Sequence, residues 1–430
     1  MVSPILTTDN NLGKAIANEA DLPNLKLIAD IHIKDLKIGD KPNLLVFPQS
    51  FDEYGDKIGD SNIISIVGDR IVTGNIMGFV GVNGTLLDIR SRFAAEDGED
   101  YFLHYMLQKV FAINLFNIQH TTNQEQIFDF LLYLFPHFLK KALAQGLFKK
   151  YRRFEYNDAN VKGAIAVNRH IRENIPFRGT VAYTTRSHSY DNEVTQLIRH
   201  TIEYLRTKEQ GRAVLNNDSD TKTYVSQIVS ATQSYNLRDR NKIINQNLRP
   251  IKHPYFSAYT DLQKICLQIL RHETIKFGRE KDQVYGILFD GAWLWEEYLN
   301  TFLKGCGFHH PKNKTHEGRR YLFDDNSGWC YPDFYNDTMV LDAKYKCYAD
   351  WSAVQNSDLY QVISYMHVLN LEKGGFIVPK ENNNLPPKTL KGLGGEMRII
   401  GVDVKHQCGS FGDYVKKMQR EENAVINGLL

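Results

Sequence analysis

The sequence predicts an α/β protein of three parts: a β-rich N-terminal domain over residues 1–95, a largely helical middle region over 96–250, and an α/β C-terminal domain over 251–430 in which helices flank a mixed sheet. Three observations support this division. The chain has 430 residues, whereas single hydrophobic cores stop growing at about 250–300 residues. Apolar residues follow a strand-like pattern before residue 95 and a helical spacing of three and four after it. Toward the C-terminus, short apolar runs alternate with helical patterns.

The N-terminal region carries the strand signals. Expected strands cover residues Ile28–Ile38, Leu44–Phe47, Ile63–Val80 and Leu86–Phe93. Asn83-Gly84, between the last two, is typical of a type I′ hairpin turn because both residue types tolerate positive φ. The last strand bears charged residues at period two, which favours a solvated face, with a partner-binding face as the alternative.

The middle region is expected to be helical, with a basic segment inside it. Predicted helices cover Tyr101–Phe116, Gln124–Phe148, Asn192–Arg206, Thr221–Ser234 and, at the start of the last domain, Ser257–Ile275. Pro136 is expected to kink or break the second helix, and the Asn-rich stretch 237–252 to be a linker. The basic residues are Lys149–Arg153, Arg169, His170, Arg172, Arg178, Arg186 and His188. They can bind nucleic-acid phosphates, contact an acidic face of a partner, or form a solvated surface.

A predicted hairpin in the C-terminal domain brings acidic and basic residues together. Asn336-Asp337 is typical of a two-residue turn, which places Asp333 opposite Val340. Because side chains alternate faces along a strand, Asp342 and Lys344 point to the same side as Val340. Asp333 is then the diagonal neighbour of Asp342, about 7–8 Å away between Cα atoms. Two carboxylates and one amine therefore share one face of the hairpin.

This group of side chains suits a hard divalent cation. Mg²⁺ prefers oxygen ligands and keeps several waters, so Asp333, Asp342 and the backbone carbonyl of Ala343 can hold it with positions left for phosphate and water. Such an ion polarises a phosphodiester and lowers the pKa of a bound water. Lys344 can orient or deprotonate that water, or neutralise charge on the phosphate. An exposed hairpin with ordinary surface charges is the alternative, but the apolar flanking residues favour a buried strand.

The spacing resembles the PD-(D/E)xK nuclease superfamily, with Pro332-Asp333 and Asp342-Ala343-Lys344 at its defining positions. The resemblance implies that the C-terminal domain is a PD-(D/E)xK core and that the chain is a metal-dependent DNA endonuclease that hydrolyses phosphodiesters. It also implies an acidic residue near the metal on an upstream helix. Glu296 is the better match for that residue, and Glu297 is the alternative in the other register.

Downstream, Gln361 and Tyr365 match the QxxxY motif of the same superfamily. They stand at positions i and i+4, so they share one face of a helix. The resemblance implies that they reach the DNA backbone or the active-site lysine, and Gln361 joins the catalytic set. Core packing explains Tyr365 equally well. The residues from Gly375 to Pro379 are expected to form the next buried strand.

The order of several segments is similar to the McrC family, the nuclease subunit of McrBC-type modification-dependent restriction systems. The segments are Val161-Lys162-Gly163, Asp191-Asn192-Glu193, Leu294-Trp295-Glu296, Leu341–Lys346 and Leu359-Tyr360-Gln361, and the similarity covers about residues 145–380. It implies a partner, an AAA+ GTPase subunit (a McrB-like hexameric ring) that recognises methylcytosine and translocates DNA. This chain would dock on the ring, stimulate it and cut double-stranded DNA, with the residues before the nuclease domain forming the docking part.

Composition and missing motifs exclude other classes of protein. Hydrophobic residues make up 42% and charged residues 24%, which rules out a disordered chain. No GxxxxGK[ST] sequence is present, so nucleotide hydrolysis by this chain is not expected. No membrane-spanning run and no secretion signal are recognisable, so we expect no membrane partner and a cytoplasmic location.

Two alternative functions remain open at this point. A stand-alone repair or mobile-element nuclease of the same superfamily would cut DNA without a GTPase. A non-catalytic adaptor with a decayed nuclease domain would only activate a motor ATPase or GTPase, although the intact Asp333, Asp342 and Lys344 argue against decay. Residues 251–430 are also expected to be large enough to fold alone.

Overall fold

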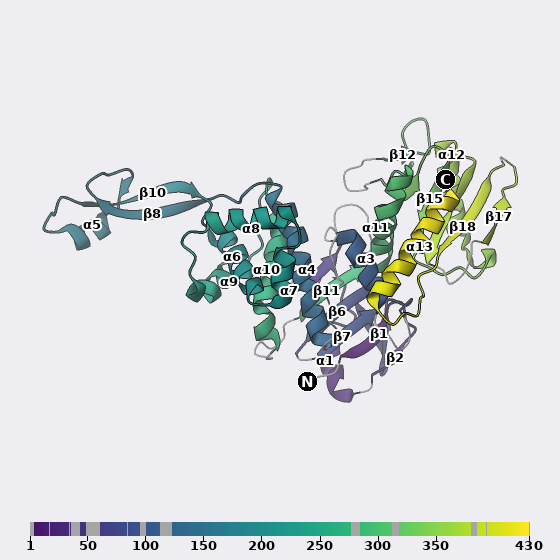
Figure 1. The fold of residues 1–430 in the computed structure, drawn as a ribbon, viewed down its shortest axis with the longest axis horizontal. Helices are drawn as coiled ribbons and strands as arrows, with labels where there is room; N and C mark the ends of the chain where they lie inside the picture. Colours follow the sequence, from purple (N-terminus) through teal and green to yellow (C-terminus); the bar gives the residue numbers. More distant parts are fainter. Residues whose placement is uncertain are drawn as a thin grey trace. The chain divides into compact units, whose positions relative to one another are not determined.

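The chain forms two compact units, residues 1–117 with 278–430, and residues 118–277. The computed structural model describes residues 4–16, 18–33, 35, 44–48, 61–83, 85–94, 100–111, 123–276, 284–311, 318–379, 385–392 and 394–429 (Figure 1). The division differs from the predicted boundaries after residues 95 and 250, because the first unit combines both ends of the chain.

A five-stranded sheet explains why the two ends belong together. Its strand order is β1-β7-β6-β11-β3, and β11 (Val284–Asp290) comes from the second half of the sequence. It pairs antiparallel with β6 (Ile76–Val82) and parallel with β3 (Leu44–Phe47). The other two strands are β1 (Ile5–Thr8) and β7 (Thr85–Arg90), and a separate three-stranded sheet contains β2 (Lys14–Ala15), β5 (Arg70–Thr73) and β4 (Ile64–Val67).

The predicted N-terminal strands are largely confirmed, with one error. Strands occur at 44–47, within 63–80 and within 86–93, and Asn83 has the positive φ (47°) expected at the hairpin turn; Gly84 lies outside the described residues. The strand predicted over Ile28–Ile38 is wrong for its described part. Helix α1 (Leu22–Leu25) precedes it, and only isolated bridges at Ala29 and His32 follow. The apolar residues that suggested a strand are buried from turns instead, since Ile28 and Ile33 are fully buried.

The second half of the first unit contains a mixed five-stranded sheet with the order β14-β15-β16-β18-β17. Strands β15, β16 and β18 are parallel, and β14 and β17 add to the two edges antiparallel. Helix α12 packs against β15 and β16, and α13 packs against β18. The predicted mixed α/β architecture is therefore confirmed. The bounds are β14 Phe334–Tyr335, β15 Met339–Ala343, β16 Lys373–Pro379, β17 Leu385–Thr389, β18 Glu396–Val402, α12 Asn356–Leu369 and α13 Phe411–Leu429.

Two further helices connect the sheets of this unit. Helix α11 (Gly291–Leu303) follows β11 directly, contacts β15 and packs on α3 (Tyr101–Phe111). Asp290 caps the start of α11, because its Oδ1 accepts hydrogen bonds from two backbone N–H groups at 2.6 and 3.0 Å. A small two-stranded sheet contains β12 (Arg320–Tyr321) and β13 (Trp329–Cys330). Within the described residues, no helix combines the length and the apolar character that crossing a membrane requires.

The second unit contains a helical body, much as the periodicity predicts. Its helices are α4 Asn123–Leu143, α6 Glu193–Arg206, α7 Glu209–Leu215, α8 Ser219–Ala231, α9 Arg240–Gln246 and α10 Ala258–Lys276. Helix α4 continues through Pro136, so the predicted break is absent. The stretch predicted as a linker instead contains α9, which packs on α6 and buries Ile243 and Ile244.

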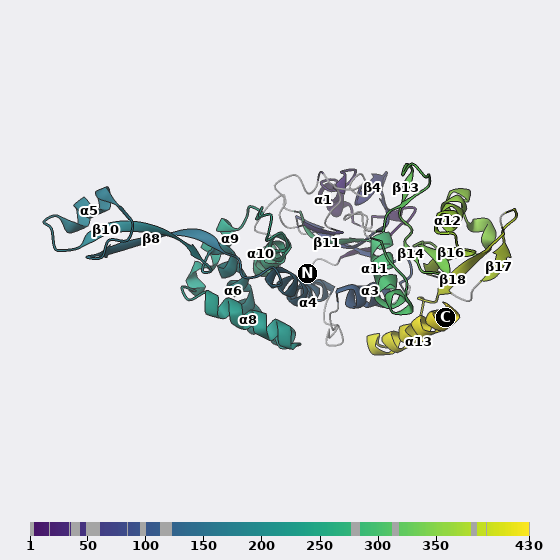
Figure 2. The same cartoon turned by 90° about the horizontal axis from the view of Figure 1, so that it is seen from above.

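A long antiparallel ribbon extends from this helical body, which corrects the prediction of a largely helical middle region. Strands β8 (Lys150–Asp158) and β10 (Val181–Ser189) pair along all nine residues, and β9 (Ala164–Ile165) and α5 (Val167–Asn174) lie toward the far end (Figures 1 and 2). The hydrophobic periodicity of the sequence did not predict these strands, because polar and basic residues occupy both faces of the ribbon and apolar residues do not alternate along it.

Candidate active site

The hairpin formed by β14 and β15 has a different register from the predicted one. Phe334 pairs with Leu341, which places Asp333 directly across from Asp342 rather than on its diagonal. The turn is shifted by one residue because the Asn336 side chain accepts hydrogen bonds from the backbone N–H of Thr338 and Met339, both at 2.9 Å. A register change of two residues preserves the face of every side chain, so the two carboxylates still lie on one side.

The two aspartates form an acidic pair in which Asp342 is buried and Asp333 is half-buried. Asp342 is only 1% exposed, and Asp333 Oδ2 accepts a hydrogen bond from the backbone N–H of Ala343 at 2.8 Å. Burial raises the pKa of both carboxyls, and in Asp342 the charge of Asp333 raises it further. Asp342 Oδ1 accepts no hydrogen bond from the described residues, whereas Oδ2 lies 2.7 Å from Lys344 Nζ. A buried, ionised carboxylate requires a positive charge beside it.

Lys344 supplies one positive charge at this point. Its Nζ lies 2.7 Å from Asp342 Oδ2 and donates a hydrogen bond to Gln361 Oε1 at 3.2 Å. Burial alone would lower the pKa of Lys344, but the carboxylates of Asp342 and Asp333 outweigh burial and raise it. Lys344 therefore carries an ammonium group at neutral pH, which suits a role as a donor and positive charge better than a role as a base.

Helix α12 brings Gln361 to the lysine, as predicted for the second half of the motif. Gln361 Nε2 donates to the hydroxyl of Tyr365 at 2.7 Å, one turn later on the helix. Tyr365 is 5% exposed. Its hydroxyl therefore orients the amide of Gln361, whose oxygen faces Lys344, and Tyr365 serves both the core and the site.

Asp358, on the first turn of α12, is a member of this network that the sequence reasoning did not select. Its carboxylate lies 3.7 Å from Lys344 Nζ, accepts a hydrogen bond from Tyr348 at 3.0 Å and pairs with Lys346 Nζ at 3.3 Å. The helical spacing could have identified Asp358, because it stands three residues before Gln361 and therefore shares its helical face.

The role predicted for an upstream acid, Glu296 or Glu297, stays a prediction. Glu296 and Glu297 are partly exposed on α11, and within the described residues no three His, Cys, Asp or Glu side chains are gathered as metal ligands. Asp333 and Asp342 fit a divalent cation by their oxygen chemistry and by the Oδ1 of Asp342, which has no hydrogen-bond partner among the described residues. The remaining ligands would have to come from a backbone carbonyl, water or a phosphate.

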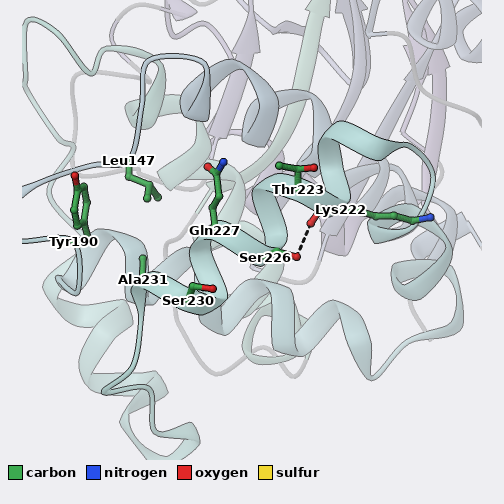
Figure 3. A pocket seen from close by; sticks show the side chains of 8 residues that line it. All are labelled: Leu147, Tyr190, Lys222, Thr223, Ser226, Gln227, Ser230 and Ala231. Atoms are coloured by element: carbon green, nitrogen blue, oxygen red, sulfur yellow. Dashed lines mark hydrogen bonds between the residues drawn. The ribbon is translucent and has the colours of Figure 1, made fainter.

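An open groove of about 630 Å³ lies in the second unit, away from these residues in the sequence (Figure 3). Polar side chains of α8 dominate its lining; in Figure 3 Ser226 donates to the carbonyl of Lys222, at 3.0 Å. The lining residues are Leu147, Tyr190, Lys222, Thr223, Ser226, Gln227, Ser230 and Ala231. They include no carboxylate, so this groove lacks the chemistry of the Asp333–Asp342 pair.

Comparison with known proteins agrees with the expected resemblance. A family model described as McrBC 5-methylcytosine restriction system component matches residues 71–379, well over half of the chain. The chain belongs to this McrBC family. The resemblance to McrC is thereby confirmed, and the match begins well before the expected start at about residue 145, because it includes strands β6 and β7 of the N-terminal sheet.

The comparison with solved structures also finds McrBC proteins, one of which is similar in fold to this McrBC-family chain. One is a refined half-complex from the tetradecameric assembly of Thermococcus gammatolerans McrB AAA+ hexamers with bound McrC, with a TM-score of 0.50, 14% identity and coverage of 97% of this chain and 100% of that chain. The cryo-EM structure of the Thermococcus gammatolerans McrBC complex matches with a TM-score of 0.36 and 14% identity, over 71% of this chain and 88% of that chain. No curated protein matches the sequence.

Proposed function

We propose that this chain is the Mg²⁺-dependent DNA endonuclease subunit of a methylcytosine-dependent restriction complex, built on a PD-(D/E)xK core. The observation that carries the proposal is the pair of buried Asp342 and half-buried Asp333, with Lys344 Nζ 2.7 Å from Asp342 and hydrogen-bonded to Gln361. Burying two carboxylates side by side costs stability, and such an arrangement is typical of a site that binds a cation or performs chemistry.

In this proposal each residue of the site has a separate role. Asp333, Asp342 and the carbonyl of Ala343 hold Mg²⁺, which when bound polarises the phosphodiester and activates the attacking water. The ammonium group of Lys344 orients that water and neutralises charge that develops on the phosphate. Gln361 keeps Lys344 beside the carboxylates through its 3.2 Å hydrogen bond. Glu296 stays the candidate for an additional acidic group near the metal, and Glu297 is the alternative.

The proposed partner is a hexameric AAA+ GTPase ring that reads the modified base and moves the double-stranded DNA. The second unit is the proposed docking part, because the far end of its ribbon exposes large apolar side chains. These are Val161, Ile165, Val167, Ile171, Ile175 and Phe177, between 42% and 68% exposed. Several exposed apolar side chains within one short segment are typical of a protein–protein contact. Three basic residues of the ribbon, Arg152, Arg169 and Arg172, are paired with Asp191, Glu155 and Glu173.

Cleavage assays with the AAA+ partner, GTP, Mg²⁺ and methylated DNA test the proposal. Asp342→Asn and Lys344→Ala should each slow cleavage by on the order of 10²–10³ or more, as for other electrostatic catalytic groups. GTP hydrolysis by the complex should persist in both variants. Asp337→Asn, in the exposed turn of the same hairpin, is the matched control and should cut normally.

The same assays separate the proposal from the alternatives. Efficient cutting of unmodified DNA by this chain without a partner would favour the stand-alone nuclease. Cleavage that survives Asp342→Asn and Lys344→Ala, or a wild-type complex that hydrolyses GTP but never cuts DNA, would refute the catalytic assignment and leave the adaptor function.

A further inference from the structure

Tyr345, the residue after Lys344, is buried against the N-terminal sheet. Successive side chains of an extended segment point to opposite sides, so Lys344 reaches the carboxylates while Tyr345 reaches the other way. The Tyr345 hydroxyl lies 2.9 Å from the Oγ of Ser91, the residue that follows β7. The Tyr345 ring packs edge-on against the Phe93 ring, with centroids 5.2 Å apart. Tyr345 is 4% exposed and Ser91 is fully buried.

The pocket around this ring is built by residues that are distant in sequence. The guanidinium of Arg92 lies 4.8 Å from the ring centroid and is fixed by the fully buried Asp9, with Nε 2.8 Å from Oδ2. Asn75 accepts a second hydrogen bond from Arg92 at 2.5 Å. Gly291, the first residue of α11, leaves room for the ring, because a Cβ there would lie 2.7 Å from Tyr345 Cε1. These contacts shape the pocket for one position of the ring.

We infer that the N-terminal sheet sets the position of Lys344 through Tyr345, which makes Tyr345 and Ser91 positioning residues for the reaction. This inference rests on the proposed nuclease function. The backbone at Lys344 is also held by its N–H, which donates to the Ile377 carbonyl at 3.1 Å. The hydrogen bond to Ile377 fixes the backbone of Lys344, and the contact with Ser91 fixes the side chain of the next residue, Tyr345. Together they fix the direction in which the Lys344 side chain leaves the backbone. The N-terminal domain thereby completes the active site without contributing a group to it.

The first test removes the tyrosine hydroxyl contact from either side. Tyr345→Phe and Ser91→Ala should each lower kcat by on the order of 10-fold with KM unchanged, less than the roughly 10²-fold that a 1 Å misplacement costs. The double variant should be no slower than the slower single variant, because both remove the same contact. Tyr105→Phe is the matched control: it deletes another buried tyrosine hydroxyl bond of this unit, to Glu422 at 2.8 Å, and should leave kcat unchanged.

The second test needs neither metal nor DNA. Acetylation of lysines in the free chain, followed by mass spectrometry, gives the reactivity of Lys344 relative to the exposed Lys416 as an internal reference. Held against Asp342 and Gln361, Lys344 should react slowly, and several-fold faster in Tyr345→Phe and Ser91→Ala but not in Tyr105→Phe.

The outcomes separate the inference from the function on which it rests. Wild-type kcat and wild-type labelling in Tyr345→Phe and Ser91→Ala would overturn the positioning role. Equal losses of kcat in the Tyr105→Phe control would overturn it as well, since the effect would then be one of general stability. Faster labelling of Lys344 in a protein whose wild type never cuts DNA would instead support the positioning role and reject the nuclease function.

Discussion

Asp100 is the buried carboxyl whose titration is simplest to follow, because it lies outside the acidic pair. Its Oδ2 accepts a hydrogen bond from the backbone N–H of Ser91 at 2.5 Å, and its Oδ1 accepts one from Leu103 at 3.0 Å, so it caps the start of α3. Burial raises the pKa of Asp100 to about 7, although both hydrogen bonds oppose the shift. The folded chain therefore holds a proton that the unfolded chain releases.

The raised pKa of Asp100 makes the free energy of unfolding fall as the pH rises. The folded-state pKa lies above the ordinary value, so the contribution of Asp100 to stability is present at low pH and is lost as the pH rises through about 7. Urea unfolding should show a free energy of unfolding that falls by about 2–4 kcal/mol from pH ~5 to pH ~8 through this group. Asp100→Asn, which keeps an acceptor but cannot titrate, should flatten that fall. An unchanged slope in the variant would assign the pH dependence to other groups.

At this scale the sequence predicted the face of each catalytic candidate but not every contact. Asp333, Asp342 and Lys344 were expected on one side because strand periodicity alone decides it, and Gln361 followed from helical spacing. The register escaped prediction because it depends on the Asn336 side chain, which closes the turn one residue later. The role of Glu296 stays a prediction, because residue spacing alone does not tell where its side chain reaches.

At the scale of elements, the C-terminal helix α13 is tied to the core by one buried carboxylate. Glu422 is 5% exposed, and its oxygens accept hydrogen bonds from Tyr105 at 2.8 Å, from Tyr298 at 3.0 Å and from Lys109 Nζ at 2.9 Å. These partners lie on α3 and α11, so a single side chain joins three helices. Burial, and after it the charge of Glu422, raises the pKa of Tyr298, which keeps its hydroxyl protonated as a donor.

Removing this carboxylate should loosen the helix. Glu422→Ala leaves two buried hydroxyls and one ammonium group without their acceptor, so we expect a loss of about 2–4 kcal/mol in the free energy of unfolding. Glu422→Gln, which keeps one acceptor oxygen, should lose less. Arg420→Ala, on the exposed side of the same helix, should change little. Equal stability of the alanine variants at 420 and 422 in thermal and urea unfolding would contradict the role of Glu422.

The elements themselves were predictable where one face of the chain is buried. Helices α6, α8 and α10 have apolar stripes, and their bounds agree with the expected ones to within a few residues. The β8–β10 ribbon has no such stripe, since β8 is exposed along most of its length and β10 buries only Ala182 and Tyr183. Its stability comes from pairing and cross-strand contacts such as the stack of Tyr156 on Tyr183, with centroids 5.3 Å apart.

At the scale of the whole molecule, the two-unit division could not be read from local patterns. Strand β11 pairs with β3 and β6, which precede it by roughly 200 residues, and no periodicity records which distant strand will be its neighbour. The same pairing argues against the expectation that residues 251–430 fold alone. That fragment would lose both neighbours of β11 and the pocket of Tyr345, and would expose Ile287, Leu288 and Phe289, which are at most 2% exposed in the intact chain.

Two truncations turn this into a prediction. Joining residues 1–117 to 278–430 through a flexible Gly/Ser linker of about 15 residues removes the second unit and keeps the first one intact. This chain should unfold cooperatively, as followed by circular dichroism, whereas residues 251–430 should show no cooperative transition because β11 lacks its sheet.

Association with the AAA+ ring provides the second readout. The linked chain should fail to co-purify with the ring, because the exposed apolar side chains of Val161 to Phe177 are gone, while the isolated 118–277 unit should still bind it. Co-purification of the linked chain would move the docking surface into the first unit. A cooperative transition in the 251–430 fragment would show that the second sheet is stable without the N-terminal strands, and the coupling of Tyr345 to the N-terminal sheet would then matter for positioning alone.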